Sequence, residues 1–437
     1  TPGEEATIAA ADRLQALAID EAAFAEHVAA RGRLDPIDEQ LAFVRVSTDG
    51  QVTSEILESH LNVPAGDPID TIQLASAAED LYGLNLHEQV SYRLIAEGGE
   101  TGVEFDARTK SYGPNILKFA VSLENAFEGS TAFNVGARLT RTGINDRGAE
   151  WQTDLQLGTD PQLISEFYQP IKAGSPFFIA PRVEFEQWNL NAFVDSDAVA
   201  RYRISESEIG FDVGTLIGSI GEFRLGTYHG TGRARVKVGD PSLETIEFDT
   251  GGALARLRFD TRDDAQFPRS GMRVDLQWNL SLPDLGADER FDTVEAEVEN
   301  TWSRGKNSWH VGAVYATTLD SQDAIQDLFR LGGFLRLSGL ERGEISGPHA
   351  AMVRLMYYRR VSESTGGILD VPIYLGASAE FGNTWQTRSD ISFDSAIANG
   401  SVFAGFDTAI GPVYLGAGFA EGGRSNYYLF FGAPPRW

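Results

Sequence analysis

From residue 115 to the end of the chain, apolar and polar residues alternate in segments of about ten, and no helical period appears. The segment 117–123 carries Leu, Phe, Val and Leu at its odd positions, and 272–280 carries Met, Val, Leu, Trp and Leu at its even positions. Successive side chains of a strand point to opposite faces, so each segment predicts a strand with one apolar and one polar face. We count sixteen segments, which begin near residues 115, 130, 149, 161, 178, 197, 221, 249, 270, 290, 306, 349, 371, 398, 411 and 425.

Alternation alone fits a soluble sandwich as well as a membrane barrel, so the strand count and the connections decide between them. An even number of strands is the rule in bacterial single-chain barrels. The connections 239–249, 319–348 and 383–398 fall on one side and are among the longest, whereas FPRSG and SRGKN on the other side are short. The pattern predicts a mainly β fold, with a 16-stranded antiparallel transmembrane β-barrel over residues 111–437.

The first 110 residues follow different periods. Residues 1–36 predict a helix with a thin apolar stripe, which suits a helical linker. Residues 37–110 then predict strand, helix, helix, strand, strand, beginning with Leu41–Ser47 and a short helix capped by Thr53. A second helix ends at Gly83, and a hairpin turns around residues 98–99. This order predicts one small α+β domain.

Composition narrows the class of protein. The chain of 437 residues is 42% apolar, which is ordinary for a soluble protein, and it lacks any run of about 18 apolar residues, so we exclude a transmembrane helix. A net charge of -27 argues against nucleic acid as a partner, and zero cysteines remove any disulfide framework. The N-terminus TPGEEATIAA lacks the basic and apolar regions of a signal peptide, so we expect either a cleaved leader or a fragment.

Candidate chemistry is sparse, and we predict no catalytic residue, no cofactor and no metal site in this chain. No complete G-x-S-x-G motif occurs, and the nearest approach, Gly376 to Ser378, lies inside a predicted strand rather than on a nucleophile turn. The six histidines are too scattered to form a metal-ligand pair at i, i+4. The glutamate-rich segment 292–300 suits an ion path or, more simply, the polar wall of a barrel.

One long connection carries a distinctive motif. Leu331–Ala350, LGGFLRLSGLERGEISGPHA, is a glycine-rich loop that leads into the arginine-bearing strand 351–360. It resembles the inward-folded loop and next strand of outer-membrane assembly-factor barrels of the BamA/TamA-like (surface antigen) kind. Arg258–Trp278 and Glu380–Trp385 resemble a hairpin and a strand end of the same superfamily, and the chain closes on aromatic residues up to Trp437. Residues 37–110 resemble a POTRA domain, a periplasmic module.

The resemblance implies a contact between this loop and the barrel wall. Assembly factors usually carry V-R-G-[FY] in the loop, whereas Ser338 stands here in place of the family arginine, and Glu380 stands where the superfamily has aspartate. Arg336 lies two residues earlier, on the same face of an extended loop, and is therefore the candidate partner of Glu380. The implied loop-to-wall motif consists of Gly332, Gly333, Arg336, Ser338, Gly339, Glu380 and Gly382.

A narrower resemblance rests on Lys110–Phe119, Gly148–Trp151, Glu166–Pro170 and the loop itself. These segments resemble the C-terminal half of bacterial patatin-like phospholipases of the type Vd autotransporter kind, which join a lipase, a linker helix, one POTRA domain and a sixteen-stranded barrel. The resemblance implies an outer-membrane anchor and translocator, with its POTRA domain in the periplasm, for a lipase passenger absent from this chain. Two alternatives stay open: a free-standing assembly and insertion factor, or a lipase polypeptide whose activity resides upstream of residue 1. The implied partners are outer-membrane lipids, the barrel-assembly machinery during insertion, the passenger in cis and a second copy of the chain.

Overall fold

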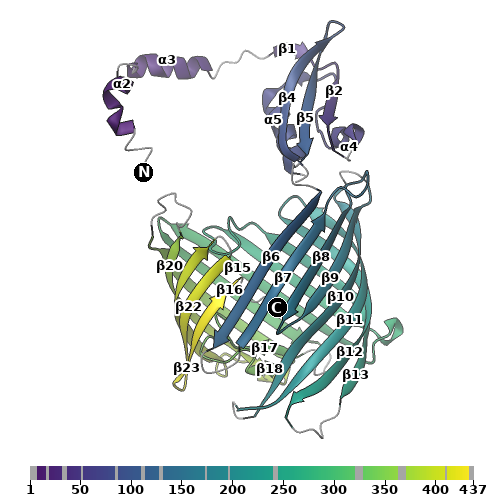
Figure 1. Cartoon of the computed structure of the whole chain (residues 1–437), viewed down its shortest axis with the longest axis vertical. Helices are drawn as coiled ribbons and strands as arrows, with labels where there is room; N and C mark the ends of the chain where they lie inside the picture. Colours follow the sequence, from purple (N-terminus) through teal and green to yellow (C-terminus); the bar gives the residue numbers. More distant parts are fainter. Residues whose placement is uncertain are drawn as a thin grey trace. The chain divides into compact units, whose positions relative to one another are not determined.

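A computed structural model shows two compact units, one built on Thr1–Lys110 and the other on Ser111–Glu363 with Val371–Trp437 (Figure 1). The structure describes residues 7–15, 19–31, 37–50, 53–83, 87–109, 114–126, 131–172, 175–194, 197–239, 245–319, 328–362, 371–408 and 411–432. The predicted aromatic terminus Trp437 lies outside these ranges.

The N-terminal segment was predicted as one helix, but the structure shows two helices separated by non-helical residues. Helix α2 covers Ala11–Gln15 and helix α3 covers Glu21–Arg31. Ile19 and Asp20 between them are not helical. The side chain of Asp20 accepts a hydrogen bond from the Ala23 amide at 2.7 Å, which starts a new helix by capping it.

The rest of the first unit is a small α+β fold. Its elements are β1 (Ile37–Gln40), β2 (Val44–Thr48), α4 (Ser54–Ser59), β3 (Pro68–Ile69), α5 (Thr71–Gly83), β4 (His87–Glu97) and β5 (Glu100–Thr109). The sheet order is β2-β5-β4, with β2 parallel to β5, and α4 and α5 contribute Leu57, Leu74 and Leu81 to a core with Phe105 of β5. The predicted hairpin is confirmed as β4 and β5. The short pair β1 and β3 was missed, because strands of two to four residues carry almost no alternation.

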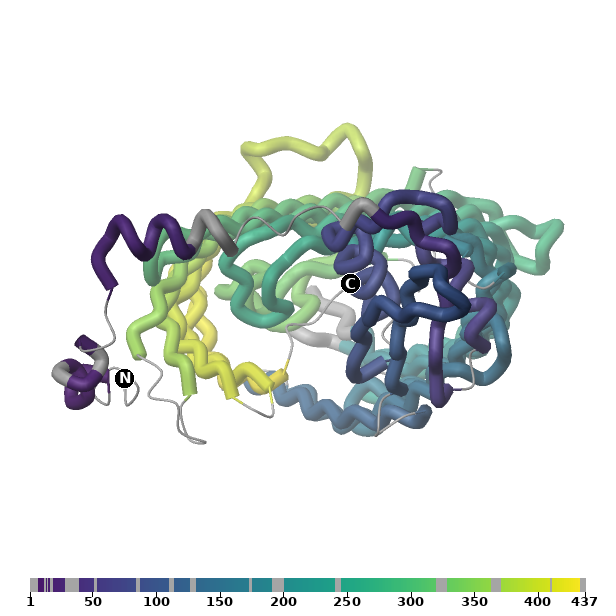
Figure 2. The backbone as a smooth tube through the Cα atoms, turned by 90° about the horizontal axis from the view of Figure 1, so that it is seen from above, coloured from purple at the N-terminus to yellow at the C-terminus, as the bar shows by residue number. Residues whose placement is uncertain are grey.

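The second unit confirms the predicted closed barrel of sixteen antiparallel strands (Figures 1 and 2). Each predicted start lies within three residues of the observed one. The strands are β6 (Asn115–Ala126), β7 (Thr131–Arg141), β8 (Glu150–Gly158), β9 (Gln162–Pro170), β10 (Phe177–Val194), β11 (Asp197–Ile217), β12 (Gly221–Val238), β13 (Ile246–Asp260), β14 (Gly271–Ser281), β15 (Phe291–Arg304), β16 (Asn307–Thr318), β19 (His349–Arg360), β20 (Ile373–Trp385), β21 (Ile397–Thr408), β22 (Gly411–Ala420) and β23 (Arg424–Phe431). Two short strands, β17 (Phe329–Leu331) and β18 (Ile345–Gly347), pair with each other.

The two faces of the barrel wall differ as the alternation predicts. Large apolar side chains point outward and are exposed, such as Phe119 at 75% and Ile209 at 60%. Inward-facing positions carry buried charges, for example Asp212 and Glu299. Among the described residues, no helix is long and apolar enough to cross a membrane. An apolar outer band over a charged interior is typical of a transmembrane barrel.

The predicted difference in loop length between the two barrel ends is weaker than expected. We call the end where β6 starts the proximal end and the opposite end the distal end. The distal connection 319–348 is by far the longest, but the proximal connections 261–270 and 361–372 have 10 and 12 residues, close to the 11 residues of the distal 386–396. The connection predicted to begin at residue 239 is short, because β13 starts at Ile246.

The barrel closes between its last and first strands, β23 and β6. Four described residue pairs join them, from Tyr428 with Ala126 to Phe431 with Leu123. Every other junction between barrel strands has at least seven pairs among the described residues. Among the described residues of the wall, this junction, called the seam below, therefore has the fewest paired residues.

Candidate functional site

The distal connection between β16 and β19 folds into the barrel. Residues 329–347, called the inner loop below, run through β17, a series of turns and β18, and are mostly buried. Their partners are inward-facing side chains of β19 to β23 and β6. Figure 1 shows β17 and β18 near the distal end of the barrel. The loop therefore occupies the lumen.

The backbone of the inner loop is tightly folded rather than extended. Gly332 and Gly333 adopt φ of 125° and 108°, which glycine tolerates without cost. Leu335 and Leu337 also have positive φ, 60° and 73°, although both carry side chains and both are buried. Left-handed geometry at a non-glycine residue costs about 1 to 3 kcal/mol, so the surrounding contacts must hold these leucines in place.

Ser338 makes the central contact with the wall. Its amide donates to Oε2 of Glu380 at 2.6 Å, and its hydroxyl donates to Oε1 of the same carboxylate at 2.7 Å. The hydroxyl oxygen in turn accepts the Leu335 amide at 2.8 Å, which helps to fix the left-handed turn. Glu380 also accepts the Ser378 hydroxyl at 2.6 Å. Both ends of this contact are almost fully buried, Ser338 at 0% and Glu380 at 2% exposed.

The predicted pairing of Arg336 with Glu380 is therefore corrected. The serine that replaces the family arginine binds the glutamate itself, and the hydrogen bonds that Glu380 accepts come from Ser338 and Ser378. The reason is geometric. The positive φ of Leu335 and Leu337 on either side of Arg336 turns it away from Ser338, so positions 336 and 338 do not share one face.

Close backbone approach explains two glycines of the site. A Cβ on Gly339 would lie 2.2 Å from the Ala420 nitrogen, and one on Gly418 of β22 would lie 1.9 Å from the Ser338 carbonyl oxygen. The Gly339 amide also donates to Oδ1 of Asn399 at 2.9 Å. Backbone thus packs against backbone, which only glycine permits. Gly382 of the predicted motif is placed elsewhere, since its Cβ would meet the Ala351 carbonyl of the neighbouring strand.

The last strand supplies site residues that sequence reasoning missed. The Tyr428 hydroxyl lies 2.7 Å from the Ser338 carbonyl and 2.9 Å from that of Leu340, and it donates to these oxygens. The side-chain amide of Asn426 donates to the Gly339 carbonyl at 3.2 Å. Both residues are buried inward-facing polar residues of β23. Their alternation with exposed Tyr427 is the one sequence signal that could have identified them.

The inner loop also contacts the strand on the other side of the seam. Arg342 lies 3.6 Å from the carboxylate of Glu124 on β6 and 3.1 Å from that of Asp160. Tyr428 on β23 and Glu124 on β6 are thus both bound to the same loop. The loop spans the seam from inside and adds to the four backbone pairs that close the wall.

The lumen beside the inner loop is filled on one side and open on the other. Phe334 packs among Phe403, Tyr414, Tyr428 and Phe430 of β21 to β23. Phe267, from the proximal turn between β13 and β14, stacks on Tyr374 at 4.2 Å and belongs to the same cluster. Against β7 to β15 lies a polar cavity of about 1170 Å³ lined by many carboxylates and arginines. The site is mechanical in character, since the loop braces the wall and packs against one side of the lumen.

The remaining candidate residues, Ser378, His310 and His349, make hydrogen bonds within or between strands of the barrel wall. Ser378 lies within β20 in extended backbone, bound to Glu380 and to the Ser401 hydroxyl. His310 contacts Thr301 and Arg354, and His349 contacts Thr317. In the described parts of the chain, no group of three or more metal-ligating side chains occurs.

Comparisons with known proteins agree with this geometry. Residues 106–411 match the Omp85 superfamily domain. The structure is similar to that of BamA from Haemophilus ducreyi lacking POTRA domains 1–3, with a TM-score of 0.69 at 13% identity, covering 89% of this chain and 83% of that one. It is also similar to CdiB from Acinetobacter baumannii, with a TM-score of 0.58 at 10% identity, covering 90% and 74% of the two chains. CdiB from Escherichia coli gives 0.57 at 10% identity, covering 90% and 76%. A comparison with curated protein sequences finds no significant match.

Proposed function

The chain belongs to the Omp85 superfamily, whose barrels lie in the bacterial outer membrane, and from this premise we propose that it is the anchor and translocator of a passenger domain in the same polypeptide. The observation that carries the proposal is the seam. Its described residues form four backbone pairs, and the inner loop bridges it from inside. A wall with one weak junction can part there, while a barrel of equally paired strands cannot part without losing many more hydrogen bonds.

The passenger we propose is a patatin-like phospholipase. The support is the sequence resemblance of Lys110–Phe119, Gly148–Trp151 and Glu166–Pro170 to the barrel half of such enzymes. The first two run into the first residues of strands β6 and β8, and the third lies in β9, which neighbours β8. Hydrolysis would belong to that passenger, and the barrel chain itself would act without cofactor or metal.

We propose that the small α+β unit, residues 37–110, is a POTRA domain in the periplasm and that residues 1–36 link it to the passenger. Its β2-β5-β4 sheet with two helices supports this assignment. The similarity to BamA covers 89% of the chain, which is more than the barrel unit alone makes up. With this unit in the periplasm, the proximal barrel end faces inward and the distal end faces outward.

The second candidate is a free-standing assembly factor that inserts other barrels. The higher TM-score to BamA than to CdiB favours it. Both candidates need a seam that opens, so the seam alone does not separate them.

The test is to read the gene upstream of Thr1 and to follow the passenger. A G-x-S-x-G motif there, and passenger that becomes accessible to external protease in intact cells, are the expected results. Leu429 and Asn125 are cross-strand partners at the seam, and the chain has no native cysteine. A Leu429→Cys/Asn125→Cys pair should therefore lock the seam when oxidised and block passenger exposure, with recovery on reduction. Exposure that continues through an oxidised seam would refute the proposed route, and insertion defects in other barrels would favour the assembly factor.

A further inference from the structure

The outer wall changes character along strands β10 to β13, which reach 15 to 21 residues and are the longest of the barrel. Toward the proximal end, their outward positions are exposed and apolar, including Phe185, Ile209, Phe211, Phe223 and Leu225. These form part of the surface that faces lipid. Toward the distal end the outward positions become polar.

Along β11 and β12 the outward-facing residues change from apolar to polar, while the same face of each strand continues to point outward. Pairing between β11 and β12 runs without a register shift from Tyr202 to Ile217, and pairing between β12 and β13 is continuous. Because side chains alternate strictly in paired strands, positions 203, 205 and 207 face the same way as Ile209. By the same count, positions 231, 233 and 235 of β12 face the same way as Leu225. The lipid-facing surface therefore passes directly into this polar region.

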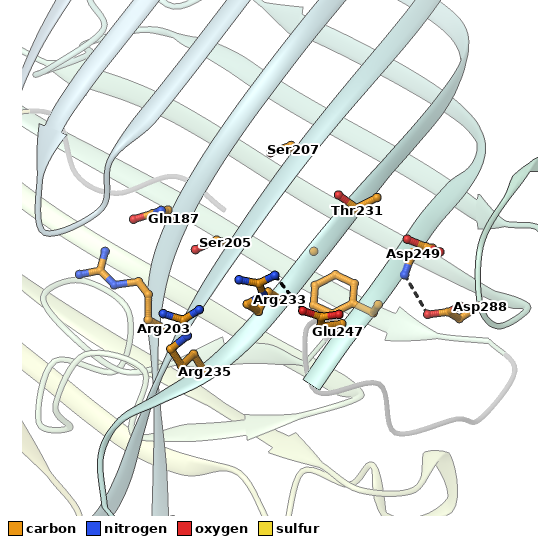
Figure 3. A pocket seen from close by; sticks show the side chains of 12 residues that line it. Gln187, Arg203, Ser205, Ser207, Thr231, Arg233, Arg235, Glu247, Asp249 and Asp288 are labelled. Atoms are coloured by element: carbon orange, nitrogen blue, oxygen red, sulfur yellow. Dashed lines mark hydrogen bonds and ion pairs between the residues drawn. The ribbon is translucent and has the colours of Figure 1, made fainter. Parts of the chain in front are cut away.

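A groove of about 760 Å³ lies in this region (Figure 3). We call it the tip groove. Its charged lining residues are Arg203, Arg233, Arg235, Glu247, Asp249 and Asp288. The three arginines come from β11 and β12, and the acids come from β13 and the next distal loop. Ser205, Ser207 and Thr231 add hydroxyl groups on the side toward the apolar surface. The groove thus has a cationic side, an acidic side and a hydroxyl-bearing edge next to lipid.

Two arginines of the tip groove, Arg203 and Arg235, have positive charges that can pair with an anionic ligand. Among the ion pairs of the described residues, Arg233 pairs with Glu247 at 2.8 Å, while Arg203 and Arg235 take part in none. Arg203 donates one hydrogen bond to the Thr159 carbonyl at 3.1 Å, which orients its guanidinium without neutralising it. Arg235 is exposed. Two guanidinium groups at the edge of a lipid-facing surface are placed to meet the headgroups of the adjoining leaflet.

We propose that the tip groove binds the phosphorylated sugar headgroup of an outer-leaflet glycolipid of the lipid A type. Arginine matches phosphate through paired charge-assisted hydrogen bonds, and carboxylates and hydroxyls accept and donate to sugar hydroxyls. The acyl chains of such a lipid lie along the apolar surface below. The proposal rests on the orientation given above, in which the distal end faces outward.

Size and charge favour this occupant over an ordinary phospholipid. Pockets of about 300 to 1,000 Å³ suit ligands with several rings, and a glycerophospholipid headgroup would leave most of the groove empty. A purely anionic headgroup would also gain nothing from Asp249 and Asp288. A sugar that carries phosphate at its edge can place phosphate over Arg203 and Arg235 and hydroxyls over the acids.

The experiment measures binding of purified lipid A to the refolded full chain in detergent, with Arg203→Gln/Arg235→Gln as the test variant. The control is Arg304→Gln/Arg359→Gln, which removes two exposed arginines at the proximal end; Trp302 and Tyr357 place them on the outward face of β15 and β19. Both variants therefore lose the same charge. Loss of two charge-assisted contacts predicts an affinity about tenfold or more weaker in the test variant, and less than about twofold weaker in the control.

Binding measurements with three different lipids identify the ligand. Wild-type protein should bind lipid A more tightly than its dephosphorylated form and more tightly than phosphatidylglycerol. Equal weakening in both variants, equal binding of the dephosphorylated form, or equally tight phosphatidylglycerol would each overturn the proposal. Retained heat-modifiable gel mobility shows that the barrel is intact, and passenger exposure in intact cells measures the proposed function separately. Failure to bind lipid A is therefore distinguishable from failure of the proposed function.

Discussion

Replacing Glu380 with alanine should release the inner loop from the barrel wall. The buried carboxylate accepts hydrogen bonds from the Ser338 amide at 2.6 Å and from its hydroxyl at 2.7 Å. A hydrogen bond to a charged group contributes about 1.5 to 3 kcal/mol, so two lost bonds amount to roughly 3 to 6 kcal/mol in a dry interior. Water from the neighbouring lumen solvates part of the freed groups, and we therefore expect about 3 kcal/mol.

The loss should appear as local opening of the loop rather than as unfolding of the barrel. Asn399, Tyr428 and Arg354 still hold the loop, and the sixteen-stranded wall is unchanged. A change of about 3 kcal/mol corresponds to roughly hundredfold faster hydrogen exchange at the Ser338 and Gly339 amides, measured by mass spectrometry on the full chain. Exchange in the strands β10 to β13 should not change.

Controls separate the Ser338 contact from other effects of the substitution. Ser378→Ala removes a Glu380 partner outside the loop and should change loop exchange by less than about threefold. In a double-mutant cycle, Ser338→Ala and Glu380→Ala should be strongly non-additive, whereas Arg336→Ala and Glu380→Ala should add. The opposite pattern, with Arg336 coupled to Glu380 and Ser338 independent of it, would refute this account of the loop.

Three further predictions follow from other parts of the structure. Gly418→Val should loosen the inner loop as much as Glu380→Ala does, because an added Cβ would lie 1.9 Å from a loop carbonyl; protease sensitivity of the loop measures this. Hydrogen bonds from the Thr109 amide and hydroxyl lower the pKa of Asp49, so the stabilisation from these two bonds is complete above pH of about 4 and is lost as the pH falls through the lowered pKa. Hydrogen exchange at the Thr109 amide should therefore rise only below that range. Asp49→Asn should abolish this pH dependence. The refolded chain should migrate faster before boiling than after it, since a closed sheet without edges resists detergent until heated, and identical migration with helical circular dichroism would contradict the barrel.

The alternation along the chain was sufficient to predict the barrel. A strand's two faces depend on neighbouring residues of the same strand, so each segment can be recognised without its partners. Sixteen segments, an even number, then allow one simple closed arrangement, and each strand begins within three residues of its predicted start. The prediction was weakest where elements are short, as for β1 and β3, because two to four residues show no period.

The site depended on information that no local pattern contains. The glycine-rich motif identified the inner loop, and Ser338, Gly339 and Glu380 do meet in the structure. The partner of Glu380 was predicted wrongly, because the prediction holds only for an extended loop. Left-handed turns at Leu335 and Leu337 change which side chains share a face. Backbone turns of this kind at leucine are strained and are held by tertiary contacts, so sequence alone does not indicate them.

Local sequence patterns also do not predict the contacts of the last strand or the tip groove. Tyr428 and Asn426 lie about 90 residues from the loop carbonyls that they bind, and they reach them because the barrel closes. Arg203 and Arg235 become neighbours through the β11–β12 register, and they lie at the edge of the lipid-facing surface because pairing carries one face along the whole strand. Local alternation thus determined which residues form strands and which face is apolar, whereas register, closure and the path of the inner loop decided which distant residues meet.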